Sequence, residues 1–167
     1  FPEGTIHPSA GLVTVNSTAV DDYLDENRVA FAHVISIDAE AHDPWVLRGL
    51  SKSFAARRVG VVEFEVSGRK EITKWSAEHQ VNMTIGPTVH WLHQLQYDCF
   101  WETPSGCVVP MSGRCWRPAT FENLQGNAVC ALRHHYSRVF WSLAAECASC
   151  TGAQLMQKIS VARGAGR

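Results

Sequence analysis

The sequence ISIDAEAHDPWVLRG, residues 35–49, decides the fold of this chain together with VGVVEFEVS, residues 59–67. Val34–Ile37, which overlaps the first stretch, and Val59–Val66 in the second are short apolar runs, the pattern of strands that are buried inside a parallel sheet. A segment with helical features separates the two runs. We therefore expect a strand, a helix and a second strand parallel to the first, joined by a right-handed crossover.

The segment between the two strands has the features of one helix. Asp43 is a favourable N-cap residue, and Pro44 is a favourable first helical residue. Four apolar side chains then recur at helical spacing and form one buried face. They are Val46, Leu47, Leu50 and Phe54. The sequence predicts a single helix of about 14 residues.

Polar side chains follow the first strand at the point where it ends. They are Asp38, Glu40 and His42. In an open α/β sheet, ligands bind at the carboxyl ends of the strands, so we place the candidate site here. Asp38 and Glu40 share a face if the strand extends through them, because side chains alternate along a strand. The simpler interpretation is that Asp38 caps a turn and Glu40 is an exposed loop acid.

The composition is that of an ordinary globular domain. The chain has 167 residues, of which 46% are hydrophobic and 19% charged, with a net charge of −1. The length supports one domain with a sizeable core. The near-neutral charge argues against nucleic-acid binding, and no apolar run approaches the roughly 20 residues of a membrane span. The chain begins at Phe1 without a signal peptide, and we expect it to be a piece of a longer protein.

The six cysteines are too few for a disulfide scaffold, although bridges form readily in a secretory protein. Cys147 and Cys150 have the CxxC spacing, but this pair stands alone in the sequence. A zinc site needs a second pair of ligands, and a redox motif needs a βαβ context. We therefore expect ordinary thiols at this pair and no metal site.

The other elements are less distinct. A short apolar run at Leu12–Val15 is a candidate strand, and the acidic segment Asp21–Asn27 is a short helix or a turn. The later elements are a helix at Val89–Leu95, strands at Tyr97–Trp101, Gly106–Pro110 and Asn127–Leu132, a loop at Ser112–Gln125, and an interrupted helix from Ser137 to Ile159.

Three segments, in this order, resemble the FkbM family of methyltransferases. They are Val20–Leu24, Ile37–Gly49 and Val62–Val66. The family's pattern is an LDxxL-like segment, then ID-x-EG-x-[DE]-x-x-VL-x-G, then a strand ending in FE; Ala41 stands where the family has glycine. The resemblance covers about residues 12–133. Its later pieces are similar to the C-terminal hairpin region of eukaryotic members: Tyr97–Phe100, Gly113–Trp116 and Gly126–Cys130.

The resemblance implies an α/β fold with the Rossmann-like sheet of a class I methyltransferase, using S-adenosylmethionine. The family binds this cofactor with a glycine-rich turn after its first strand, and this chain has no such turn before Asp21. The resemblance therefore implies an incomplete sheet that lacks the first two strands, with Leu12–Val15 not paired to Val34–Ile37. We expect a partial methyltransferase domain at residues 1–135, then a C-terminal helix and flexible tail at 136–167.

The resemblance also suggests roles for the acids at the strand ends. Asp21 falls where the family's adenine-side loop lies, and we assign it to cofactor binding together with Asp38. Methyl transfer from a sulfonium to an oxygen needs an in-line approach and often a general base. Glu40 or His42 is then the residue that removes the hydroxyl proton.

Two acids in the second strand and two tryptophans further on are candidates for substrate binding. Glu63 and Glu65 share one face of their strand, and Glu65 lies near its carboxyl end, so it faces either the site or a structural ion pair. Glu63 is expected to pair with a cation such as Arg57 or Arg58.

Trp101 and Trp116 flank a glycine-containing loop. Aromatic side chains often form platforms for sugars, so we assign both to acceptor binding. The alternative interpretation is that they are ordinary core or loop anchors.

The sequence therefore predicts an enzyme that methylates a hydroxyl on a small molecule or glycan, of which this chain is an incomplete copy that is inactive alone. One alternative is a nucleotide-sugar transferase that uses Asp38 and Glu40 to hold a divalent metal. The other alternative is a non-catalytic, degenerate domain that serves as a binding or structural module. The sequence indicates neither the methyl acceptor nor the compartment.

Overall fold

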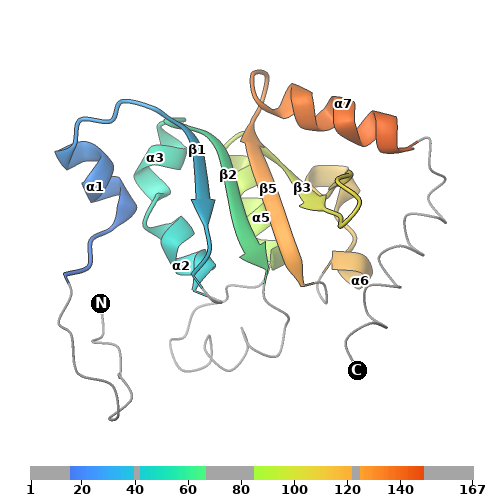
Figure 1. Ribbon diagram of the computed structural model, residues 1–167, viewed down its shortest axis with the longest axis horizontal. Coiled ribbons are helices and arrows are strands. Elements are labelled where there is room, and N and C mark those ends of the chain that lie inside the picture. The colour runs from blue at the N-terminus through green and yellow to red at the C-terminus, as the bar shows by residue number, and fades with distance from the viewer. Residues whose placement is uncertain (1–15, 40–41, 67–84, 122–124, 149–167) are drawn as a thin grey trace, which may run out of the picture.

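The structure, a computed structural model, describes residues 16–39, 42–66, 85–121 and 125–148. These residues form a five-stranded mixed sheet with helices packed against it (Figure 1), which confirms the expected α/β class. The strands are β1 (Ala32–Ile37), β2 (Val59–Val66), β3 (Tyr97–Glu102), β4 (Val108–Pro110) and β5 (Gly126–Leu132). The strand order is β1-β2-β5-β3-β4.

The described helices follow the order of the chain. They are α1 (Val20–Glu26), α2 (Asp43–Arg48), α3 (Ser51–Ala55), α5 (Ile85–Gln94), the 3₁₀ turn η1 (Gly113–Cys115), α6 (Pro118–Phe121) and α7 (Ser137–Ala148). None of them is long and apolar enough to cross a membrane. The predicted strand at Leu12–Val15 and the end of the predicted last helix lie outside the described residues.

The parallel pair β1–β2 confirms the prediction that these two strands run in the same direction. Val34 lies opposite Val61 and Ile37 lies opposite Phe64, with both strands running in the same direction. Both strands therefore end at the same edge of the sheet, at the bottom of Figure 1.

The connection between β1 and β2 is two short helices, so the prediction of one continuous helix is wrong. Helix α2 ends before Gly49, and α3 begins at Ser51. A Cβ atom at Gly49 would lie 3.2 Å from the carbonyl oxygen of Val46 and 3.5 Å from the amide nitrogen of Val20. The break also leaves the Gly49 carbonyl to accept a hydrogen bond from the Asp21 amide at 2.8 Å. Contact with α1 therefore accompanies the break between α2 and α3.

Strand β5 joins the two halves of the sheet. It runs antiparallel to β2 on one side and to β3 on the other, and the β3–β4 pair completes the sheet. The main core lies on one face, where α2, α3 and α5 place Leu47, Phe54 and Leu92 against Val62 and Phe64. A smaller apolar cluster lies on the other face beneath α7. Its members are Phe100, Val108, Val129, Ala144, Val61 and Phe140.

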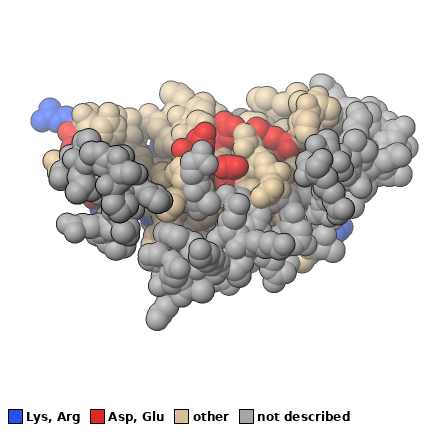
Figure 2. Space-filling model, turned by 60° about the horizontal axis from the view of Figure 1, so that its bottom comes forward, with Lys and Arg blue, Asp and Glu red and all other residues tan. Residues whose placement is uncertain are grey.

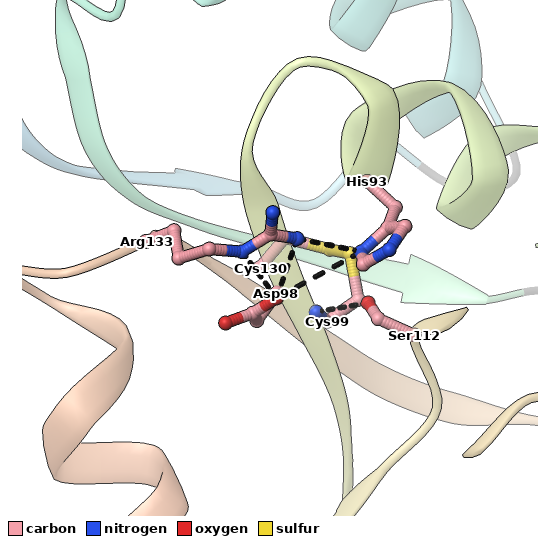
Figure 3. The surroundings of a disulfide bond; sticks show 6 residues. All are labelled: His93, Asp98, Cys99, Ser112, Cys130 and Arg133. Carbon is pink, nitrogen blue, oxygen red and sulfur yellow. Dashed lines mark hydrogen bonds and ion pairs between the residues drawn. A yellow bond between two sulfur atoms is a disulfide. The ribbon is translucent and has the colours of Figure 1, made fainter. Parts of the chain in front are cut away.

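A disulfide bond and an ion pair fasten β3 to β5 (Figure 3). Cys99 and Cys130 are opposite one another on the two strands and form a disulfide in the core. Beside it, Arg133 donates to the Asp98 carboxylate from two guanidinium nitrogens, at 2.9 and 3.0 Å. Cys107 is also disulfide-bonded, and Cys115 is a free thiol. The sequence analysis allowed for disulfide bonds without predicting them, and Cys99, Cys130 and Cys107 form them.

The Asp98 carboxylate connects several elements. Trp141 of α7 donates an indole N–H to it at 3.1 Å, and Arg133 also donates to Nδ1 of His93 on α5 at 2.8 Å. Burial alone would raise the pKa of Asp98, but hydrogen bonds from Arg133, Trp141 and Ser137 and the Arg133 charge hold that pKa below its ordinary value. Its stabilising contribution is therefore present above the ordinary aspartate pKa of about 3.9 and is lost as the pH falls through the lower folded-state value.

Replacing Asp98 with asparagine should lower the free energy of unfolding at pH 7 by about 2–4 kcal/mol, because the Asp98 side chain is only 10% exposed and its charge pairs with Arg133 there. The variant should also lose less stability than the natural chain between about pH 5 and pH 2. Urea unfolding at several pH values measures both effects. Asp25→Asn is the control, because Asp25 pairs with Arg58 at an exposed position, where such pairs contribute about 1 kcal/mol or less. Equal losses of unfolding free energy in the two variants would contradict the conclusion that the Asp98–Arg133 pair stabilises the fold more than an exposed pair does.

Candidate functional site

The candidate site lies where β1 and β2 end. Asp38 directly follows β1 and is exposed, and Glu65 is the second-last residue of β2 and is half-buried. Because Ile37 lies opposite Phe64 in the parallel register, the next residue along each strand, Asp38 and Glu65, falls at the same edge. The structure therefore brings these two predicted site residues to one end of the sheet. Glu40 lies outside the described residues.

Asp43 does not cap helix α2 in the way that the sequence predicted. Helix α2 begins at Asp43 itself, and His42 in the N-cap position makes no side-chain capping bond. The Asp43 carboxylate is instead fully buried and accepts hydrogen bonds from the amides of Glu65, at 3.0 Å, and Ala39, at 3.4 Å. The carboxylate takes these partners because the strand ends leave backbone N–H groups that need an acceptor. Pro44 lies in the first turn, as predicted.

His42 is exposed and held by the turn that precedes α2. Its amide and its Nδ1 atom both lie within hydrogen-bonding distance of the Ala39 carbonyl oxygen, at 3.0 and 3.2 Å. A carbonyl oxygen accepts only, so this contact favours the tautomer with the hydrogen on Nδ1. Nε2 is then the basic nitrogen of the ring.

Asp21 has a structural task. It is buried in α1, and its two carboxylate oxygens accept hydrogen bonds from the amides of Lys52, at 2.7 Å, and Ser53, at 2.9 Å. These amides belong to the first turn of α3, which has no capping side chain of its own. Asp21 therefore caps α3 from another helix. Its assignment to cofactor binding stays a prediction.

Acidic and amide side chains line the face of the sheet near the ends of β1 and β2. Glu63 accepts hydrogen bonds from Ser36 of β1, at 3.3 Å, and from Asn127 of β5, at 3.0 Å. Figure 2 shows acidic side chains gathered near the middle of the face that comes forward when the bottom of Figure 1 is turned toward the viewer. The predicted pairing of Glu63 with a cation such as Arg57 or Arg58 is wrong, because both Glu63 carboxylate oxygens accept from Ser36 and Asn127 instead, and Arg58 pairs with Asp25 at 2.6 Å.

The charge of Glu63 affects Glu102 on β3. Burial raises the pKa of Glu102, and the negative charge of Glu63 raises it further. Two carboxylates on one face disfavour simultaneous ionisation. The end of the sheet therefore has a local excess of negative charge. Glu63 and Glu102 were not among the predicted site residues, and only the placement of β5 between β2 and β3 brings them to one face.

The two candidate platform tryptophans pack against the protein. Trp101 is only 4% exposed and contacts the backbone at Gly126, where an added Cβ would lie 3.1 Å from the ring. Trp116 is half-buried, stacks on Phe121 and passes 3.0 Å from the Cβ position of Gly86. These contacts fit the alternative interpretation of both residues as anchors. Their assignment to the acceptor stays a prediction.

No group of three histidine, cysteine, aspartate or glutamate residues is placed to hold a metal ion within the described part of the chain. The acid pair of the transferase alternative includes Glu40, which lies outside that part.

Comparison with known proteins identifies the class of this chain. The Methyltransferase FkbM domain family matches residues 5–99, more than half of the 167 residues. The chain therefore belongs to the FkbM methyltransferase family, as the ordered motifs indicated. No curated protein and no solved structure matches the chain significantly.

The charge relation between Glu63 and Glu102 can be measured directly. Replacing Glu63 with glutamine should lower the pKa of Glu102, because a neighbouring charge disappears, while burial keeps that pKa above its ordinary value. Carbon-detected NMR titration of the Glu102 carboxyl measures the change. Asp25→Asn, at an exposed pair elsewhere, should leave it unchanged. An unchanged pKa of Glu102 in Glu63→Gln would contradict the proposed repulsion.

Proposed function

We propose that this chain is part of an S-adenosylmethionine-dependent methyltransferase that acts on a hydroxyl oxygen of a small molecule or a sugar. The observation that carries the proposal is the FkbM domain match over residues 5–99. The matched residues include β1, β2 and the segment between them. They therefore include every predicted acid at the strand ends.

The sheet is the later part of a Rossmann-like sheet that continues past β1 in the whole domain. Among the described residues, β1 pairs only with β2 and so lies at an edge of the sheet. Its Val34 side chain is 66% exposed, although parallel strands are normally covered on both faces. Within the described part of the chain, this edge also has backbone N–H and C=O groups that no second strand pairs. Both features support a further strand and a covering helix beside β1.

The residues at the strand ends fit a cationic cofactor. S-adenosylmethionine, when bound, supplies a methyl group on a positively charged sulfonium sulfur. Asp38 is exposed at this edge and Glu65 lies at the same edge, so their charges favour a cation there. Asp38 binds the cofactor in this proposal, and Glu65 contacts the acceptor.

The base is Glu40 or His42. The base takes the proton of the acceptor hydroxyl while the hydroxyl oxygen bonds to the methyl carbon and the carbon–sulfur bond breaks. His42 is exposed at this edge, and its contact with the Ala39 carbonyl orients its ring, which supports this residue. Glu40 follows Asp38 by two residues, which keeps it within the same short segment.

Calorimetric titration of S-adenosylmethionine tests the proposal. We expect no measurable binding to residues 1–167 alone, and binding to a longer protein that includes the residues naturally preceding Phe1. The reason is that the missing glycine-rich turn and first two strands supply most of the cofactor site in this proposal. If neither protein binds S-adenosylmethionine, the proposed function is rejected in favour of a non-catalytic module. If residues 1–167 bind it without the preceding residues, the argument that the missing strands supply the cofactor site is rejected.

Glu40→Gln separates the base from cofactor binding. If Glu40 is the base, this variant of the longer protein should lose at least about 100-fold in kcat, the usual effect of removing a general base, while its Kd for S-adenosylmethionine stays unchanged. Glu26→Gln, on the exposed end of α1, is the control and should keep full turnover. Unchanged turnover in Glu40→Gln would remove Glu40 from the mechanism and make His42 the next residue to replace.

A further inference from the structure

The Asp43 carboxylate bridges the ends of the two parallel strands. One oxygen accepts from the Glu65 amide at the end of β2, at 3.0 Å, and the other accepts from the Ala39 amide two residues after β1, at 3.4 Å. Asp43 itself is the first residue of α2, so one side chain connects this helix to both strand ends. The bridge therefore joins the two places where the candidate site residues lie.

Ala39 contacts both Asp43 and His42. The Ala39 amide donates to Asp43, and its carbonyl accepts from the His42 amide at 3.0 Å and contacts Nδ1 of the same residue at 3.2 Å. The amide and the carbonyl of Ala39 thus connect the buried Asp43 carboxylate to the exposed His42 ring. Movement at Asp43 would displace His42 and the end of β2 relative to one another.

The burial of Asp43 needs a reason. Its side chain has 0% exposure, and removing a carboxylate from water is costly unless hydrogen bonds compensate. Helix α2 already begins with proline in its first turn and gains no side-chain cap from Asp43. Hydrogen bonds to a buried polar group offset the cost of removing it from water. The buried carboxylate therefore serves to hold the two strand ends.

We propose that Asp43 is a positioning residue for methyl transfer: it fixes the segment with Asp38 and His42 against the end of β2 with Glu65. This inference rests on the proposed function, because it concerns the same site. Its importance follows from geometry, since a displacement of about 1 Å can reduce an enzymatic rate about 100-fold.

Asparagine at position 43 tests the bridge without removing volume. An amide side chain accepts with one oxygen and presents N–H groups at the other position, so Asp43→Asn can keep only one of the two bonds. In the full-length protein, hydrogen exchange should become at least tenfold faster at one of the two amides, Ala39 or Glu65, and stay slow at the other. General destabilisation would instead accelerate both amides equally.

Tyr97→Phe is the matched control. The Tyr97 hydroxyl donates to the carbonyl of Val59 at 2.7 Å, so this variant also removes a buried hydrogen bond to β2, but at the opposite end of that strand. It should leave exchange at Ala39 and Glu65 unchanged. At a temperature where all three proteins are folded, kcat should fall at least tenfold in Asp43→Asn and stay within twofold in Tyr97→Phe.

The outcomes separate the two proposals. Normal kcat and unchanged exchange at both amides in Asp43→Asn would overturn the positioning role, as would equal losses of kcat in the two variants. If no version of the protein binds S-adenosylmethionine, the proposed function fails. Hydrogen exchange in Asp43→Asn then tests the bridge by itself. Faster exchange at only one of the Ala39 and Glu65 amides supports the bridge, and equal acceleration at both, or acceleration at neither, overturns it.

Discussion

The parallel pairing of β1 with β2 is the constraint on which the candidate site depends. Parallel strands cannot be joined by a tight turn, so the chain must leave one end of the sheet and return to the other. Helices α2 and α3 make that return and bury Leu47 and Phe54 against the sheet. Both strands then end at one edge, and their terminal backbone amides need an acceptor there. Asp43 supplies it.

Local patterns predicted the elements better than their arrangement. The apolar run Val59–Val66 is β2 to the residue, because alternation and bulk are properties of the run itself. The break at Gly49 was missed because it depends on α1, whose backbone fills the space beside it. The place of β5 between β2 and β3 was also outside the reach of the sequence, since strand order is set by contacts between segments far apart in the chain.

The same division holds for the site. Asp38 and Glu65 were predicted as candidates from their places at strand ends, and the register brings those places together. The sequence assigned Asp43 to a helix cap, because aspartate before proline is typical of one, and only the tertiary fold offers it the Glu65 amide. Glu63 likewise found Ser36 and Asn127 rather than an arginine. Sequence patterns therefore do not predict which hydrogen-bond partners the polar side chains of the site find.

The disulfide between Cys99 and Cys130 makes the covalent structure of this chain depend on its surroundings. It closes a loop across 31 positions of sequence, a constraint on the unfolded chain that is worth about 4 kcal/mol in the chain-entropy description. Such a bond forms and persists in an oxidising environment and is reduced in a cytosol rich in glutathione. Material made in the bacterial cytosol and material made in the periplasm would therefore be two different molecules, equal in sequence and unequal in stability.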